Sequence, residues 1–141
     1  MGGSWSVYWY NGAIVSSEIA RGLDVMELTP SAFVSQNEID AAKTVHWDYL
    51  NAQGQPKIVW PPSFALARAY VDQLERNKCL SASRIAGVRQ ALSAAEKASG
   101  GARNTALSTL SSQLAGEASS SCDSGRVQKL SQAVKDLAVT S

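Results

Sequence analysis

The chain has 141 residues, of which 45% are hydrophobic and 18% are charged, and its formal net charge is +1. This composition is typical of a soluble globular chain and argues against extended disorder. The sequence has no long apolar run, and its start, MGGSWSVYWYNG, lacks the basic and apolar regions of a leader. We therefore expect neither a membrane span nor a signal peptide within this chain.

The charge is divided unevenly along the chain. Residues 1–60 carry three Lys or Arg against six Asp or Glu, and residues 61–141 carry ten against six. The first part is therefore acidic and the second basic, but no block of consecutive basic residues is present. This pattern is typical of solvated surfaces, so we expect no nucleic-acid partner.

The N-terminal segment predicts a β-meander. The aromatic and β-branched run Trp5–Tyr10 is followed by Asn11-Gly12 and a second β-rich run, Ala13–Glu18. Asn-Gly favours the type I′ turn, whose twist matches that of the strands it joins. A second reversal leads into a third strand over residues 23–28.

Both faces of this meander carry large side chains. Simple alternation places Trp5, Val7 and Trp9 on one face and Tyr8 and Tyr10 on the other. A sheet of three strands needs a packed hydrophobic face to be stable in water. We therefore expect both faces to meet neighbours.

The segment SVYWYNGAIVSSEIARGLDVMELTP resembles a late blade of the bacterial β-propellers that are built from LVIVD repeats. Those repeats pair an aromatic strand and an Asn-Gly hairpin with a closing strand. The residues that carry the likeness to the closing strand are Gly22, Leu23, Val25, Leu28 and Pro30. The resemblance covers 25 residues, 6–30, and the helical remainder is similar to the tail that follows the propeller in some of these proteins.

The resemblance implies a non-enzymatic C-terminal part of a secreted or cell-surface repeat protein. Its partners would be the upstream propeller blades, with another protein as a further possibility. A propeller typically has about 4 to 8 blades of four strands, whereas only three strands are expected here. The upstream blades are therefore expected outside this sequence, which is either a truncated reading frame or a piece cut to expose the tail.

Residues 29–60 are expected to join the meander to the helical part. Thr29-Pro30 predicts an N-cap and a short turn over residues 31–34. Ser35 and Glu38 match a capping box that starts a helix from Gln36 to about Lys43. The expected apolar stripe of this helix is Ile39, Ala42 and Val45. Beyond it, Gly54 and Pro56 interrupt an aromatic connector that ends at Trp60.

Residues 61–141 predict four short helices. Apolar residues recur at helical spacing in four segments, and the short connections favour an antiparallel up-down-up-down bundle. The predicted core residues are Phe64, Ala67, Val71, Leu74, Ile85, Val88, Leu92, Ala95, Leu107, Leu110, Leu114, Val127, Leu130, Val134 and Leu137. The expected fold class is α+β, mainly α, with a β-meander over 1–28, a short helix and connector over 29–60 and a four-helix bundle over 61–141.

The two cysteines, Cys79 and Cys122, fall in the first and third loops of the predicted bundle. In an up-down-up-down arrangement those loops lie at the same end, so the pair is a candidate disulfide; two unrelated thiols are the alternative. A bridge that closes about 40 residues is expected to stabilise the fold by roughly 4 kcal/mol. It would also indicate an oxidising compartment.

The sequence contains no catalytic or metal-binding motif. The single histidine, His46, has no Ser or Cys placed beside it for nucleophilic catalysis, although an enzyme using His46 and Asp48 is a minor alternative. One His and two distant Cys fit no zinc spacing. Glu18 and Asp24 bracket a strand reversal and are expected to be solvated. We expect no enzymatic activity and no cofactor or metal.

The strongest binding signal is aromatic, because Tyr and Trp are favoured at interfaces. The interface candidates are Trp5, Tyr8, Trp9, Tyr10, Trp47, Tyr49 and Trp60. Alternatively, these side chains pack the strands onto the connector and the first helix. A second functional hypothesis is a free-standing helical adaptor that binds a protein or an anionic polymer through a basic surface of Arg68, Arg76, Lys78, Arg84 and Arg89.

Overall fold

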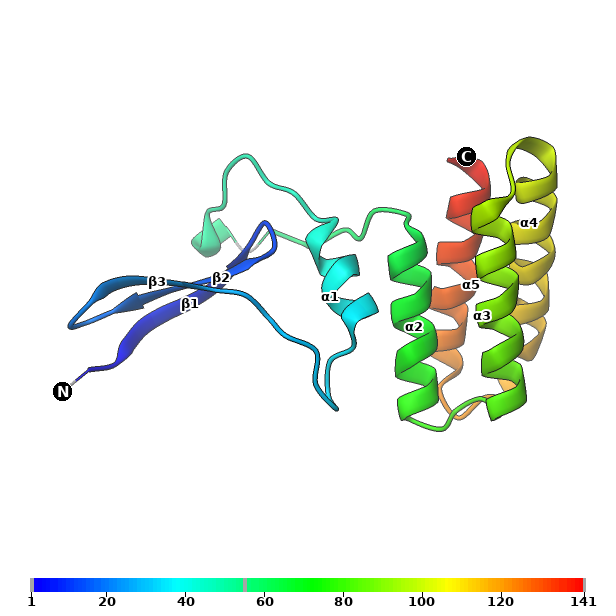
Figure 1. Cartoon of the computed structure of the whole chain (residues 1–141), viewed down its shortest axis with the longest axis horizontal. Coiled ribbons are helices and arrows are strands. Elements are labelled where there is room, and N and C mark those ends of the chain that lie inside the picture. The colour runs from blue at the N-terminus through cyan, green and yellow to red at the C-terminus, as the bar shows by residue number, and fades with distance from the viewer. Residues whose placement is uncertain (1, 55, 141) are drawn as a thin grey trace. The chain divides into compact units, whose positions relative to one another are not determined.

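The computed structural model describes residues 2–54 and 56–140. The fold is α+β and mainly α, as predicted, with a three-stranded sheet followed by five α-helices (Figure 1). The chain divides between Pro61 and Pro62 into two compact units, the first with the sheet and one α-helix and the second with four α-helices. None of the helices in the described ranges is long and apolar enough to cross a membrane.

The predicted meander is confirmed. Strands β1 (Ser4–Tyr10), β2 (Ala13–Glu18) and β3 (Gly22–Met26) form an antiparallel sheet in the order β1-β2-β3. The β1–β2 turn has φ values of 47° at Asn11 and 92° at Gly12, as a type I′ turn requires. A Cβ at Gly12 would also lie 3.2 Å from Cγ of Lys43, a close contact that the lysine side chain would have to relieve by a small shift.

The register divides the sheet residues into two faces, because residues directly opposite each other in antiparallel strands share a face. The tryptophan face consists of Val7, Trp9, Ile14 and Met26, and the tyrosine face of Tyr8, Tyr10, Val15, Leu23 and Val25. The register shifts between Ser4 and Ser6, which makes Trp5 an extra residue in β1. The bulge interrupts the simple alternation expected for Trp5, Val7 and Trp9.

Helix α1 (Gln36–Lys43) begins at the predicted capping box. The Ser35 hydroxyl accepts the backbone N–H of Glu38, and the Glu38 carboxylate accepts that of Ser35. The buried residues here are Ile39, Ala41 and Val45, whereas the predicted Ala42 is only half-buried. The turn predicted at Thr29-Pro30 is capped differently, since the Ser31 hydroxyl accepts the N–H groups of residues 33 and 34.

The predicted four-helix bundle consists of α2 (Phe64–Arg76), α3 (Ala82–Lys97), α4 (Gly100–Glu117) and α5 (Ser124–Val139). Each helix packs on two others, in the cyclic order α2-α3-α4-α5. Figure 1 shows successive helices running in opposite directions. The side chains of Ser63, Ser81 and Asp123 cap α2, α3 and α5 by accepting free backbone N–H groups.

The core of the bundle contains the predicted apolar residues, except that Phe64 is half-buried at its margin. One polar pair lies inside it. The hydroxyl of Ser111 in α4 donates to the carbonyl of Ser131 in α5, and the hydroxyl of Ser131 donates to the carbonyl of Ser111, both at 2.9 Å. This reciprocal pair satisfies two buried hydroxyls and fixes the contact between the two helices.

Candidate interaction surface

A small network of hydrogen bonds ties the hairpin turn to the connector. The side-chain amide of Asn11 donates from Nδ2 to the carbonyl of Trp47 at 2.9 Å, and its Oδ1 accepts the N–H of Trp47 at 2.8 Å. The hydroxyl of Tyr10 donates to the carbonyls of Trp47 at 3.1 Å and Asp48 at 3.3 Å. We call these contacts the Asn11 latch. They hold residues 47 and 48 beside the turn of the sheet.

An open groove lies between the tyrosine face and the latched connector. It has a volume of about 520 Å³ and is lined by Tyr8, Tyr10, Val15 and residues 48–53. These residues include Tyr49 and the first two residues of the short 3₁₀ helix η1 (Ala52–Gly54). Tyr10 is fixed by the latch, whereas Tyr8 and Tyr49 are exposed. The groove therefore offers aromatic surface to a partner.

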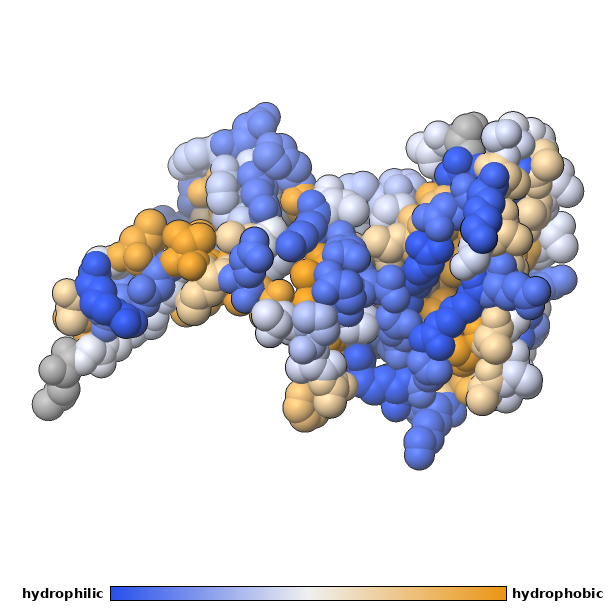
Figure 2. Space-filling model, viewed as in Figure 1, coloured by the Kyte–Doolittle hydropathy of each residue, from blue (hydrophilic) through white to orange (hydrophobic). Residues whose placement is uncertain are grey.

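The rest of the sheet is open on both faces. On the tryptophan face Val7 is 57% exposed and Met26 45%, and on the tyrosine face Leu23 is 63% exposed and Val25 65%. Part of this apolar surface is visible over the strands in Figure 2. Neighbouring apolar side chains that are this exposed typically mark a site of protein contact. The coverage expected on both faces is therefore incomplete.

The seven aromatic interface candidates separate into two groups. Trp9, Tyr10 and Trp47 are half-buried within the first unit. The exposed ones are Trp5, Tyr8, Tyr49 and Trp60. The expectation that the aromatics pack within this part of the chain thus holds for the first group. The second group faces solvent, as expected of an interface.

Glu18 closes the other end of the sheet, and its carboxylate has a structural role that the expected solvation does not describe. Its carboxylate accepts the backbone N–H groups of Arg21 and Ala20 at 2.7 Å and that of Gly3 at 2.6 Å. These hydrogen bonds, that of Arg21 first, hold the pKa of Glu18 below its ordinary value of 4.5. Glu18 therefore stabilises the β2–β3 turn and fastens residue 3 to it.

Most of the predicted basic surface is engaged in ion pairs across the helices. Arg68 lies 2.6 Å from Glu96, Arg84 lies 2.7 Å from Glu117, and Arg89 bridges Asp72 at 2.7 Å and Glu75 at 2.6 Å. The hydrogen bond from Arg68 lowers the pKa of Glu96, and those from Glu75 and Asp72 raise the pKa of Arg89. Arg76 and Lys78 are exposed near the end of α2. The ion pairs of Arg68, Arg84 and Arg89 weaken the case for an anionic ligand.

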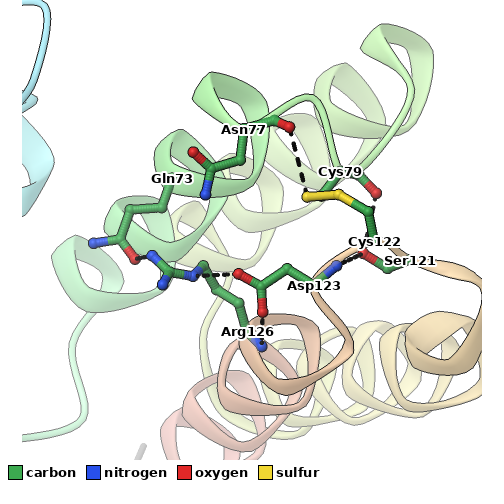
Figure 3. A network of polar contacts seen from close by, with 7 residues as sticks. All are labelled: Gln73, Asn77, Cys79, Ser121, Cys122, Asp123 and Arg126. Atoms are coloured by element: carbon green, nitrogen blue, oxygen red, sulfur yellow. Dashed lines mark hydrogen bonds and ion pairs between the residues drawn. A yellow bond between two sulfur atoms is a disulfide. The ribbon is translucent and has the colours of Figure 1, made fainter.

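Cys79 and Cys122 form the predicted disulfide, with their Cα atoms 5.0 Å apart. The hydroxyl of Ser121 donates to the carbonyl of Cys79 at 3.0 Å, which adds a second link between the two loops (Figure 3). The dashed contact of Cys79 with Asn77 is not a hydrogen bond, because a disulfide sulfur carries no proton. A disulfide of this kind is typical of proteins in an oxidising environment.

The same end of the bundle holds a polar network around Arg126 (Figure 3). Its Nε donates to Asp123 at 2.9 Å, and its Nη1 donates to the amide oxygen of Gln73 in α2. Arg126 thus joins α5 to α2 beside the disulfide.

The geometry gives little support to chemistry at His46. Its Nε2 lies 3.8 Å from Asp48, both side chains are exposed, and the two cysteines are consumed in the disulfide. Within residues 2–54 and 56–140, no group of three His, Cys, Asp or Glu side chains could hold a metal ion.

Comparison of the chain with protein-family models, with curated proteins and with solved structures finds no match.

Two important side chains were missed in the sequence. The sequence pattern predicts only a turn role for Asn11 and only a solvated carboxylate for Glu18. The available signal was their type, since Asn can donate and accept at once and a carboxylate can accept several N–H groups. Their partners, Trp47 and Gly3, lie 36 and 15 residues away, and no local pattern identifies them.

Proposed function

We propose that this chain is a non-enzymatic, protein-binding part of a secreted or cell-surface repeat protein. In this proposal the β-meander completes a larger β-structure, such as the last blade of an LVIVD-type propeller. The disulfide-linked bundle caps that structure or binds a further protein. The observation that carries the proposal is the exposure of apolar side chains on both faces of a three-stranded sheet, which is more than so small a sheet normally leaves open.

Two further observations support the proposal. The Asn11 latch and Glu18 fasten the two ends of the sheet, so its exposed faces are presented on a fixed frame. A preorganised surface loses less conformational entropy on binding. The disulfide supports the secreted or cell-surface location, because such bonds form and persist in oxidising compartments.

The test is a binding titration against a propeller of LVIVD-type repeats that lacks its last blade. We expect saturable association by calorimetry, because the open sheet supplies three of the four strands of the missing blade. The variant Leu23→Ser/Val25→Ser should weaken it at least about tenfold, since two apolar contacts are lost.

The matched control is Val59→Ser/Val139→Ser. It removes two equally aliphatic side chains, 75% and 82% exposed, from outside the sheet. This control should bind like the unaltered chain. No association, or an equal loss in both double variants, would refute the proposed function.

A further inference from the structure

The two edges of the sheet differ in what they can bind. In the order β1-β2-β3, the outer edges of β1 and β3 pair with no strand in the described part of the chain. We propose that β1 pairs antiparallel with β1 of a second copy of this chain, about a two-fold axis at Tyr8. The inference rests on the proposed function in one respect only, namely that this sheet accepts further strands.

The backbone of β1 presents a regular set of groups at its free edge. In a two-residue hairpin the residues that flank the turn form a hydrogen-bonded pair, and such pairs alternate with non-hydrogen-bonded ones along the ladder. Tyr10 and Tyr8 therefore bond to β2, while the N–H and C=O groups of Trp9 and Val7 point to the free edge. The alternation continues across β2, so the N–H and C=O groups of Leu23 and Val25 point to the free edge of β3.

The length of the regular segment fixes the register of the pairing. The bulge at Trp5 and the turn at Asn11 limit regular strand to residues 6–10, whose midpoint is Tyr8. A two-fold axis there places Val7 opposite the partner's Trp9 and Tyr8 opposite the partner's Tyr8. The outward N–H and C=O groups of Val7 then lie opposite the outward groups of the partner's Trp9, so each can form a hydrogen bond. Aromatic and β-branched cross-strand pairs of this kind stabilise a sheet.

Charge explains why β1 rather than β3 forms this contact. No residue of β1 carries a charge, so an antiparallel copy brings no like charges together. The corresponding arrangement of β3 is centred on Asp24 and would place two carboxylates opposite each other. Natural sheets commonly protect edges by charge in this way. Association therefore ends at a two-fold dimer with a six-stranded sheet.

The first test measures mass against concentration by sedimentation velocity. The unaltered chain should change from 15.0 kDa to twice that mass between low micromolar and near-millimolar concentration, because pairing along five residues makes a small interface. Val7→Pro removes one outward N–H and should weaken the dimer at least about tenfold. Val25→Pro is the matched control at the outward position of β3 and should leave the dimer intact.

The second test examines the register and does not depend on proline. Tyr8→Lys and Tyr8→Glu should each weaken self-association, because the axis places residue 8 opposite itself. An equimolar mixture of the two should restore a heterodimer. The same pair of substitutions at Tyr49, an exposed tyrosine of the connector, should show no rescue on mixing.

The outcomes separate this inference from the proposed function. A monomer at all concentrations, an equal effect of the two proline variants, or no rescue between the residue-8 variants would overturn the β1 dimer. Binding of the truncated propeller in those cases would leave the proposed function in place. A dimer that shows the expected variant pattern without any propeller binding would support the inference and reject the proposed function.

Discussion

The side-chain amide of Asn11 pairs with both backbone groups of Trp47, donating to its carbonyl at 2.9 Å and accepting from its N–H at 2.8 Å. A neighbouring strand would make the same two contacts. One residue thus supplies both the positive φ of the hairpin turn and the anchor of the connector. The two roles can be separated, because glycine can adopt the turn without supplying the amide.

Asn11→Gly should release the connector while the hairpin persists. Two hydrogen bonds are lost in a half-buried site, so we expect a local cost of roughly 1 to 3 kcal/mol. Amide hydrogen exchange at Trp47 should become faster, whereas exchange within β1 and β2 should change little. Asn11→Asp keeps the acceptor and loses the donor, so its exchange rate at Trp47 should lie between those of the unaltered chain and Asn11→Gly. Unchanged protection of Trp47 in Asn11→Gly would contradict the latch.

The β2–β3 turn should depend on pH through Glu18. The pKa of this carboxyl is lowered in the folded protein from its ordinary value of 4.5, so the folded state binds fewer protons than the unfolded state. Its contribution to stability is therefore complete above about pH 4.5 and is lost as the pH falls through the lowered value.

Amide chemical shifts of Gly3, Ala20 and Arg21 should titrate together below pH 4.5. Glu18→Gln should abolish that shared titration, and Glu27→Gln, at an exposed position near the end of β3, should leave it unchanged. Independent midpoints for the three amides would rule out a shared carboxylate.

Loss of the Cys79–Cys122 disulfide should destabilise the second unit. A sequence separation of 43 residues corresponds to roughly 4 kcal/mol on the chain-entropy estimate. Urea unfolding of Cys79→Ser/Cys122→Ser should show a lower midpoint, and a reducing agent should shift the unaltered chain but not the double variant. Two free thiols in non-reduced, denatured protein would show that the bond does not form.

The pair Ser111 and Ser131 should behave as a coupled unit. Each hydroxyl donates to the other residue's carbonyl, and the two hydroxyl oxygens also lie 3.2 Å apart, so removing one leaves the other without its hydroxyl neighbour. Ser111→Ala and Ser131→Ala should each cost about 1 kcal/mol, and the double variant should cost less than their sum. Ser112→Ala, at an exposed position of α4, should have little effect. Strict additivity would indicate two independent hydroxyls.

The helical part was predictable because its pattern is long and its loops are short. In α4, for example, Leu107, Leu110 and Leu114 recur at helical spacing, and all three are buried. The disulfide followed from the alternation of the loops. A single-residue bulge leaves no such periodic signal, and the irregularity at Trp5 was therefore not foreseen.

The candidate surface was less predictable because it depends on distant contacts. Composition identified the aromatic residues, but only the fold separates exposed Tyr8 and Tyr49 from half-buried Trp9 and Trp47. The ion pairs give a second example. Arg68 and Glu96 lie on different helices, and their meeting depends on how each helix is rotated about its axis.

The position of the disulfide also determines how the bundle responds to mechanical load. The start of α2 and the end of α5 lie at the end of the bundle opposite the cross-link. A force applied at these two points can unfold only α2 and α5 before it reaches the disulfide. The 43-residue span between the cysteines then carries no tension. The extended chain is therefore shorter by about 150 Å than it would be without the disulfide. The segment that contains α3 and α4 therefore adds no length at extensions that unravel α2 and α5.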